Sequence, residues 1–322
     1  MEILEIICTA EDDTFKRLDQ MLVSKCPDLS RTAIKNLFEK GMITSDSVKL
    51  ELKRTPPLNT IIKVTIPAPV PTEAIPENIP LDIIFEDEHL LIVNKVAGMV
   101  THPAPGNYTG TLVNAVLFHC KDLQAIGDKI RPGIVHRLDK GTSGVMVVAK
   151  NKKCHEALVE IFSKHDIKRC YEAITLNPNI EKSGELRSYI DRSNRDRKKM
   201  ANFDKKGKLA ITNFKVLEYF KKFTHTELTL ETGRTHQIRV HLSGILNAPI
   251  LMDPTYGNPK NHLNLVNKEI SNLIKEYPYP FLHAKLLGFT HPITKEELLF
   301  TSPPPKIFLD VLSLLQKEKL NR

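Results

Sequence analysis

The stretch GIVHRLDKGTSGVMVVA, residues 133–149, joins two segments of opposite character. Its last six residues, 144–149, form an apolar run that predicts a buried strand. The residues before that strand form a charged loop in which Asp139 stands between Arg137 and Lys140. Cationic neighbours favour the ionised form of a carboxylate even when it is partly buried. A charged turn with a capping aspartate would have the same pattern, so the loop alone allows a structural or a chemical role.

Two glycines of this loop, Gly141 and Gly144, permit the close approach of another backbone.

Around the loop, helix and strand patterns follow one another irregularly. The segment LDIIFEDEHLLIVNK, residues 81–95, predicts two strands around an acidic turn. Further patterns predict helices at 111–119 and 151–165 and strands near 169–176, 211–219 and 224–231. This irregular order favours an α+β fold over a doubly wound parallel sheet.

A proline-rich segment, PAPVPTEAIPENIP at 67–80, divides the chain. It holds five prolines in fourteen residues, which is typical of an extended, semi-rigid linker because proline fixes φ and removes a hydrogen-bond donor. We therefore expect a small domain over 14–66, a linker over 67–80 and a catalytic-sized domain over 81–312.

The small domain shows two amphipathic helices followed by a strand. Residues 15–26 have apolar side chains at helical spacing, and a second helix is expected to begin after Ser30 and end at Gly41. A short strand is expected at 61–66. Lysine and arginine stand on the polar faces, so the domain is a candidate for binding RNA.

The chain is basic, with a formal charge of +8 and a pI near 9.1. Two zones carry the excess: residues 14–70 hold ten Lys/Arg against five Asp/Glu, and residues 181–222 hold thirteen against six. A basic surface suits a polyanionic partner such as nucleic acid. Each zone taken alone is equally compatible with ordinary solvated surface.

The five cysteines are scattered and form no C-x-x-C pair, which indicates reduced thiols rather than disulfides or a zinc site. We expect no metal.

No apolar run is long enough to cross a bilayer, and the acidic amino terminus does not resemble a signal peptide. These features favour a cytoplasmic protein that does not bind membranes.

Two further stretches carry candidate chemistry. KRCYEA, residues 168–173, places Tyr171 in a basic strand, where it could stack on a base or pack in the core. LETGRTHQIRVH, residues 230–241, predicts a strand that ends at a glycine and a helix capped by Thr235, with Ile238, Leu242 and Ile245 facing inward. Arg234 and Arg239 would then lie at the strand–helix junction, either as catalytic cations or facing a phosphate or solvent.

Together these stretches resemble the large-ribosomal-subunit pseudouridine synthase family, the RluA group. The resemblance extends over nearly the whole chain. It rests on H-R-L-D-x-x-T-S-G at 136–144, K-R-C-Y-E-A at 168–173, and G-R-T-H-Q-I-R-V-H at 233–241, with further matches at 94–103, 195–201, 252–257 and 282–284. The departures are Val96, Gly141 and Met252, none of them at the catalytic position.

The resemblance implies a fold, an activity and roles for individual residues. The fold is a mixed, mainly antiparallel sheet with flanking helices. The activity is isomerisation of uridine to pseudouridine, which needs no cofactor because nothing is oxidised or added. Asp139 would be the nucleophile, Arg239 its ionic partner, and Tyr171 the ring that stacks on the uracil. The residues expected to bind the substrate are His136, Arg137, Leu138, Arg234 and Leu282, with His136 and Arg137 filling the space of the flipped base or holding a phosphate.

The amino-terminal domain resembles the small RNA-binding module named after a small-subunit ribosomal protein, the S-four domain. The matches are FKRLD at 15–19 and LSRTAIKNL at 29–37, while TSDS at 44–47 replaces the usual Asn-Gly turn. The residues expected to bind RNA are Arg17, Arg31, Lys35, Arg192, Arg195, Arg197, Lys198 and Lys199.

Several alternatives stay open at this point. The expected partner is structured RNA, most naturally large-subunit ribosomal RNA or its precursor particle, bound by a monomer. Transfer RNA could be the substrate instead. A non-catalytic RNA-binding ribosome-assembly factor is a second interpretation, although Asp139, Tyr171 and Arg239 favour the enzyme. A metal-dependent nuclease would need an acidic ligand cluster that the sequence lacks.

Overall fold

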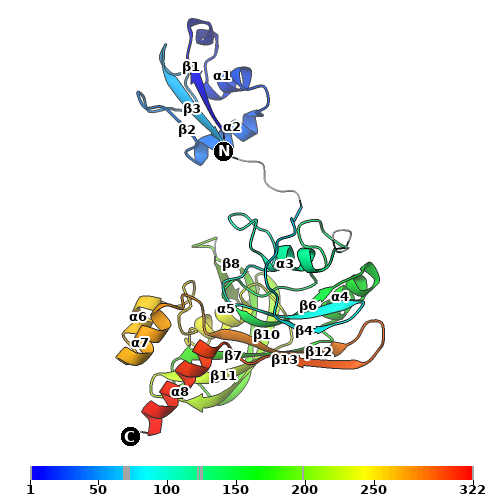
Figure 1. Ribbon diagram of the computed structural model, residues 1–322. Coiled ribbons are helices and arrows are strands. Elements are labelled where there is room, and N and C mark those ends of the chain that lie inside the picture. Colours follow the sequence, from blue (N-terminus) through cyan, green and yellow to red (C-terminus); the bar gives the residue numbers. More distant parts are fainter. Residues whose placement is uncertain (1, 68–72, 122, 124–125, 198, 321–322) are drawn as a thin grey trace. The chain divides into compact units, whose positions relative to one another are not determined.

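The computed structural model describes residues 2–67, 73–121, 123, 126–197 and 199–320 (Figure 1). The chain divides into two compact units, Met1–Pro71 and Thr72–Arg322. The division falls inside the predicted linker. Part of that linker belongs to the larger unit, because the Ala74 N–H donates to the Lys129 carbonyl at 3.0 Å and the Glu77 N–H to the Asn114 carbonyl at 2.9 Å. Residues 68–72 lie outside the described part of the chain.

The smaller unit is a three-stranded antiparallel sheet with two α-helices. Its elements are β1 (Glu2–Ile7), the 3-10 helix η1 (Ala10–Thr14), α1 (Leu18–Lys25), α2 (Arg31–Glu39), β2 (Ile43–Thr44) and β3 (Ile61–Ile66), with strand order β1-β3-β2. The sequence did not lead us to expect β1, which pairs along the whole of β3. The unit therefore begins before residue 14, where the predicted domain started.

Local signals set the second helix of this unit, as expected. Ser30 caps α2 by accepting a hydrogen bond from the Ala33 N–H at 3.2 Å, and Gly41 lies beyond its end with φ +69°. Ile34 and Leu37 face a core shared with α1 and β3. The helix is thus held by packing as well as by its cap.

The larger unit is built on one mixed sheet. Its strands are β4 (Ile83–Glu86), β5 (Leu90–Lys95), β6 (Ser143–Ala149), β7 (Lys168–Leu176), β8 (Ser183–Arg192), β9 (Met200–Phe203), β10 (Lys208–Tyr219), β11 (Phe223–Leu230), β12 (Leu282–Thr290) and β13 (Glu297–Thr301). Among the described residues the strand order is β4-β5-β6-β12-β7-β11-β10-β8-β9, and β13 pairs with β12. Only β6 and β12 pair in parallel within this described sheet, so the expected α+β, mainly antiparallel fold is confirmed.

Gly144 is the point at which β6 meets β12. Its φ is +120°, and a Cβ there would collide with the backbone of Ala284. The predicted close backbone approach at this glycine is therefore confirmed. At Gly141 the neighbour is instead a side chain, since a Cβ would come within 2.6 Å of the Pro280 ring.

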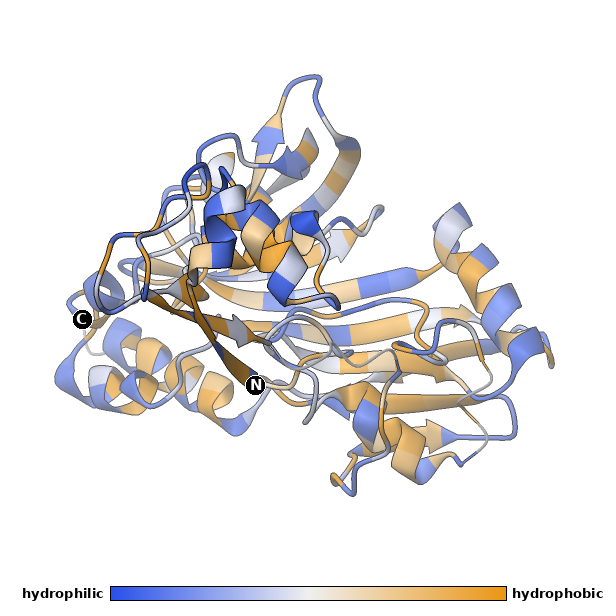
Figure 2. Ribbon diagram, turned by 90° about the horizontal axis from the view of Figure 1, so that it is seen from above, coloured by the Kyte–Doolittle hydropathy of each residue, from blue (hydrophilic) through white to orange (hydrophobic). Residues whose placement is uncertain are grey.

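Helices cover both faces of the sheet. They are α3 (Leu112–His119), α4 (Lys152–Lys164), α5 (Gln237–Gly244), α6 (Pro259–Leu263), α7 (Lys268–Lys275) and α8 (Lys306–Leu320). Alternate residues of β6 enter different cores: Met146 and Val148 pack with α3, whereas Val145 and Val147 pack with α4. Figure 2 shows the resulting concentration of hydrophobic residues along the strands. In the described part of the chain, every helix is too short or too polar to span a bilayer.

Candidate active site

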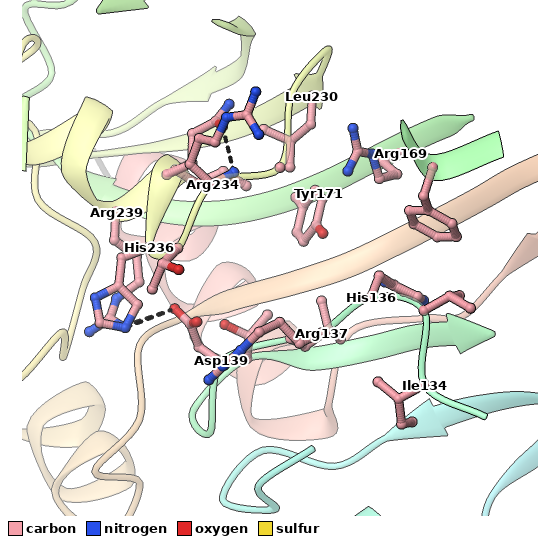
Figure 3. Close-up of a pocket in the computed structure, with 18 of the residues that line it drawn as sticks. Ile134, His136, Arg137, Asp139, Arg169, Tyr171, Leu230, Arg234, His236 and Arg239 are labelled. Atoms are coloured by element: carbon pink, nitrogen blue, oxygen red, sulfur yellow. Dashed lines mark hydrogen bonds and ion pairs between the residues drawn. The ribbon is translucent and has the colours of Figure 1, made fainter. Parts of the chain in front are cut away.

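A pocket of about 630 Å³ opens between the loop before β6, the strand β7 and the junction of β11 with α5 (Figure 3). This volume lies within the range of roughly 300–1,000 Å³ that is usual for ligand sites. The pocket brings together all eight residues that the sequence predicted for catalysis or substrate binding. They are His136, Arg137, Leu138, Asp139, Tyr171, Arg234, Arg239 and Leu282.

The loop that carries Asp139 is held in place through hydrogen bonds to its backbone carbonyl groups. The Thr101 hydroxyl donates to the Leu138 carbonyl at 2.8 Å, and the Gly98 N–H donates to the Lys140 carbonyl at 2.7 Å. The Thr142 N–H donates to the Asp139 carbonyl at 3.0 Å. The peptide groups on both sides of the aspartate are therefore fixed, so its carboxylate is presented from a rigid support.

Arg239 connects two carboxylates. Its Nη1 donates to Asp139 Oδ2 at 3.0 Å, while Nε and Nη2 donate to the two oxygens of Asp253 at 2.7 and 2.8 Å. The pairing of Arg239 with Asp139 that the family resemblance implied is present. The bidentate Asp253 contact was not predicted, although its motif was noted, because nothing in the sequence shows which arginine a distant aspartate will meet.

Burial makes the contact between Arg239 and Asp253 strong. Asp253 has no exposed surface, and 6% of Arg239 is exposed. Burial alone would raise the pKa of Asp253, but the bonds from Arg239 and from the Thr255 and Tyr256 N–H groups lower it. Tyr256 also places its ring 5.0 Å from the guanidinium. Asp253 therefore fixes Arg239 and leaves one edge of its guanidinium for Asp139.

His236 also approaches Asp139, at the same carboxylate oxygen that Arg239 contacts. The Tyr256 hydroxyl accepts from the Met200 N–H at 3.0 Å and also forms a hydrogen bond with His236 Nδ1 at 2.7 Å. The other ring nitrogen, Nε2, is 3.7 Å from Asp139 Oδ2. Burial lowers the pKa of His236 despite the nearby charge of Asp139. The ring thus faces the carboxylate in a setting whose burial disfavours its charged form.

The start of α5 differs from the prediction. Thr235 does not cap the helix; the N-cap is His236, with φ +58° and no side-chain cap bond. Gln237 instead fixes the turn before the helix, since its Oε1 accepts from the Arg234 N–H at 2.9 Å and from the Thr232 hydroxyl at 2.8 Å. Ile245 is also not inward: it follows the helix and is 39% exposed. This turn aims His236 and Arg239 at Asp139 from one side.

Tyr171 forms the middle of the pocket wall. It lies on β7, where Glu172 points to the opposite face and pairs with Lys285. Burial raises the pKa of Tyr171 to about 12, so its phenol is neutral. Leu282, on the neighbouring strand, is buried beside it. Together they offer a flat ring and an aliphatic side chain to a planar ligand.

His136 lines the pocket but does not fit a phosphate. Its Nε2 accepts from the Val147 N–H at 3.1 Å, and its ring stacks on Phe162 with centroids 4.6 Å apart. Burial lowers the pKa of His136 to about 3, so the ring is neutral. Arg137, by contrast, is exposed at the pocket and has no ion pair within the described chain. Of the two residues, only Arg137 can hold an anion.

Lys95 is a residue of the site that sequence reasoning missed. Its side chain is 1% exposed, and Nζ donates to the Val96 and Met99 carbonyls at 3.0 and 2.9 Å. Burial lowers the pKa of Lys95 to about 7, against the opposing effect of the Asp139 charge. It supports the 96–101 loop on which the Asp139 loop rests. Its motif, residues 94–103, was noticed, but a lysine in sequence does not show that it is buried.

The basic residues predicted to bind RNA near the site lie on the hairpin of β8 and β9. Arg192, Arg195 and Arg197 are exposed, and Lys199 is half-buried. Lys198 lies outside the described residues. The hairpin is joined to the site through the Tyr256 hydroxyl, which contacts both Met200 and His236. This position suits RNA that enters the pocket.

In the smaller unit, two of the predicted RNA-binding residues share one carboxylate. Arg17 donates to both oxygens of Asp19 at 2.9 and 3.0 Å, and Arg31 donates to Oδ2 at 3.0 Å. These bonds hold the pKa of Asp19 well below its usual range. Asp19 is buried, so the two guanidinium groups are held near one another with unused N–H groups. Lys35 is exposed beside Glu39.

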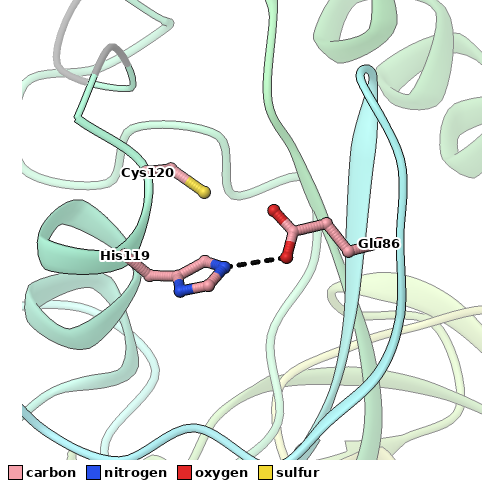
Figure 4. Close-up of side chains that lie close together, drawn as sticks. All are labelled: Glu86, His119 and Cys120. Carbon is pink, nitrogen blue, oxygen red and sulfur yellow. Dashed lines mark hydrogen bonds and ion pairs between the residues drawn. The ribbon is translucent and has the colours of Figure 1, made fainter.

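A third cluster lies away from the pocket (Figure 4). Glu86, His119 and Cys120 place their ligand atoms within 4.8 Å of one another. His119 Nε2 is 2.8 Å from one oxygen of Glu86, and Lys150 donates to the other at 2.7 Å. A cation of the chain itself thus already neutralises Glu86, and the contacts are explained as ion pairing.

A buried arginine that holds a carboxylate at the edge of a pocket fits an enzyme of carboxylate chemistry. Comparison identifies which one. A family model described as RNA pseudouridylate synthase matches residues 89–244. The chain is 42% identical over 295 residues to the ribosomal large subunit pseudouridine synthase D of Zymomonas mobilis, covering 90% of both chains. It is 39% identical over 313 residues to the uncharacterized RNA pseudouridine synthase YlyB of Bacillus subtilis, covering 97% of this chain and 98% of that one.

A solved structure agrees. Human RNA pseudouridylate synthase domain containing 4 is 26% identical, with a TM-score of 0.56, over 73% of this chain and 92% of that chain. The protein belongs to the RNA pseudouridylate synthase family, whose members are isomerases.

Proposed function

We propose that this protein isomerises specific uridines of large-subunit ribosomal RNA to pseudouridine, with Asp139 as the nucleophile. The observation that carries the proposal is the pair of contacts by which Arg239 holds Asp139 while itself fixed on buried Asp253. Relatives from Zymomonas mobilis and Pseudomonas aeruginosa that match over most of this chain are named ribosomal large subunit pseudouridine synthase D. These names favour ribosomal RNA over transfer RNA.

The reaction requires three events at one base. The bond between C1′ and N1 breaks, the uracil turns, and a bond forms between C1′ and C5 as C5 loses its proton and N1 gains one. Asp139 supplies the attacking oxygen and leaves again, so no electrons or atoms are gained overall. Tyr171 stacks on the uracil, and Leu282 packs against it from the adjacent strand. The uridine reaches them by flipping out of its stack, at a cost of a few kcal/mol.

The RNA is held outside the pocket by the two basic zones. The smaller unit acts as an S-four-type RNA-binding domain through Arg17, Arg31 and Lys35, and the β8–β9 hairpin holds the backbone near the target. Phosphate contacts of this kind position the RNA but carry no sequence information directly. Shape and unpaired loops of the RNA then provide the selectivity.

The test is the variant Asp139→Asn, which keeps the shape and removes the charge and the nucleophilic oxygen. Ribosomal and transfer RNA from cells that lack the gene are incubated with each protein, and pseudouridine is measured by tritium release and mass spectrometry. We expect parent activity on ribosomal RNA and none from Asp139→Asn, with similar RNA affinity. Asp310→Asn, on the distant helix α8, is the matched control.

Substantial turnover by Asp139→Asn would refute the proposed nucleophile. If the parent acts on transfer RNA alone, transfer RNA replaces ribosomal RNA as the substrate. Tight binding without any product from the parent would favour the non-catalytic assembly factor.

A further inference from the structure

Arg169 is a buried cation that the reaction described above does not use. It lies two residues before Tyr171 on β7, so both side chains project from the same face of the strand into the pocket. Only 8% of Arg169 is exposed. Its Nη2 donates to the Glu231 carbonyl at 3.3 Å, and its Nε has no hydrogen-bond partner. Within the described residues no carboxylate lies within ion-pair distance of it.

Such an environment is unfavourable for a guanidinium group. Arginine stays protonated in proteins, and a buried charge without a counter-ion or full hydrogen bonding costs free energy. Arg239 shows the ordinary solution, since two carboxylates accept its three hydrogen bonds. Arg169 has one long bond to a neutral carbonyl, so its remaining donors are available to a ligand in the pocket.

The neighbours of Arg169 are also basic, so this part of the pocket favours binding of an anion. Arg234 lines the same wall and uses its Nε on the Leu209 carbonyl at 2.9 Å, and His165 lies close to both arginines. Figure 3 shows Arg169 and Arg234 on one side of Tyr171 and Asp139 on the other. The pocket therefore has a cationic wall opposite its carboxylate.

We propose that Arg169, together with Arg234, binds one of the two backbone phosphates that flank the target uridine. This inference rests on the proposed function, because it takes the ligand to be RNA. A pocket of about 630 Å³ that admits one flipped nucleotide places the sugar and base at Asp139 and Tyr171, which leaves that nucleotide's own phosphate for the opposite wall. The arginines would also keep this anion away from the Asp139 carboxylate.

Gly233 fits the same arrangement. A Cβ at this position would lie 2.6 Å from Arg169 Nη1, so any larger residue would displace the guanidinium. The variant Gly233→Ala therefore moves Arg169 without removing its charge. It provides a second test that does not depend on how Arg169 variants fold.

The first experiment measures binding of uridine, uridine 3′-phosphate and uridine 5′-phosphate by calorimetry to the full-length protein. In the parent, one monophosphate should bind about 10- to 100-fold more tightly than uridine, as expected for charge-assisted hydrogen bonds. Arg169→Gln should bring that ratio close to one, and Gly233→Ala should lower it. Arg131→Gln, in the same pocket but already paired with Asp128, should retain it.

The second experiment uses substrate RNA with a methylphosphonate at each phosphate beside the target uridine. At one of these positions, the methylphosphonate should lower the kcat/KM of the parent by the same 10- to 100-fold factor. The same modification should leave the kcat/KM of Arg169→Gln unchanged. A phosphate preference that survives in Arg169→Gln, or that disappears only in Arg137→Gln, overturns the proposal. So does a parent that binds uridine and both monophosphates equally. Phosphate-dependent binding without any pseudouridine formation would instead refute the proposed function and leave this site standing.

Discussion

Replacing Asp253 by asparagine should both destabilise the protein and slow its reaction. The amide keeps the shape and the three hydrogen bonds that Oδ1 accepts, from Arg239 Nη2 and from the Thr255 and Tyr256 N–H groups. At the other oxygen, an NH₂ group would face Arg239 Nε–H, which is now 2.7 Å from Oδ2. One charge-assisted bond becomes a contact between two donors, and a buried guanidinium loses one of its two counter-charges.

The loss of a partner from a buried ion pair typically costs about 3–5 kcal/mol, and we expect a decrease of this size in the free energy of unfolding. Arg239 would keep its Nη1 bond to Asp139 and its Nη2 bond to the oxygen at position 253 but lose the bond at Nε, so its position would be less well defined. Misplacement by about 1 Å can lower turnover roughly 100-fold. Urea unfolding followed by circular dichroism measures the first effect, and kcat from tritium release measures the second.

The pH dependence gives a separate check. The folded pKa of Asp253 is lowered, so its stabilising contribution is present above the unfolded value of about 3.9 and is lost as the pH falls through the folded value. The difference between parent and Asp253→Asn should therefore shrink in acid. If the variant unfolds within about 1 kcal/mol of the parent at pH 7 and keeps full turnover, the role given to Asp253 is wrong.

Three further predictions concern other parts of the molecule. Asp19→Asn should weaken RNA binding roughly tenfold although it removes a negative charge, because two arginines lose their common support; tighter binding in a filter assay would contradict this. Relative to Lys95→Met, the parent should gain stability between about pH 7 and 10, because the unfolded lysine binds its proton more tightly than the folded one; parallel urea curves would contradict it. Replacing Arg195, Arg197 and Lys199 by alanine should flatten the salt dependence of RNA affinity, by roughly 0.9 in the logarithmic slope for each phosphate that is no longer neutralised, and an unchanged slope would make them ordinary surface.

Sequence patterns predicted the elements whose signals are local. The strands around the acidic turn at 87–89, the capped helix after Ser30 and the apolar strand β6 all follow from periodicity, caps and turns. The late strand β12 was not predicted, because it is central in the sheet and its residues are apolar or buried on both faces, so they do not alternate. Strand β1 was missed because its short, charged segment gains order only by pairing with β3.

The candidate site also has features that the sequence could predict and features that it could not. Its residue types came from motifs, and the pairing of Asp139 with Arg239 came from the family resemblance. The parts that depend on tertiary contacts could not be predicted: the bond of Asp253 to Arg239, the burial of Lys95, and the neutral packing of His136 on Phe162. In each of these cases, what the side chain does depends on which distant segment covers it.

The central place of β12 also determines when the site can form. This strand lies between β6, which follows the Asp139 loop, and β7, which carries Tyr171, yet it is among the last strands of the chain. Asp139 and Arg239 are 100 residues apart, a distance that a ribosome covers in roughly 5–20 s. A nascent chain therefore exposes its aspartate without its partner for that time, and the two halves of the sheet are joined only when β12 emerges. Activity is thus the property of a nearly finished polypeptide, and a chain that stops before Leu282 should be inert.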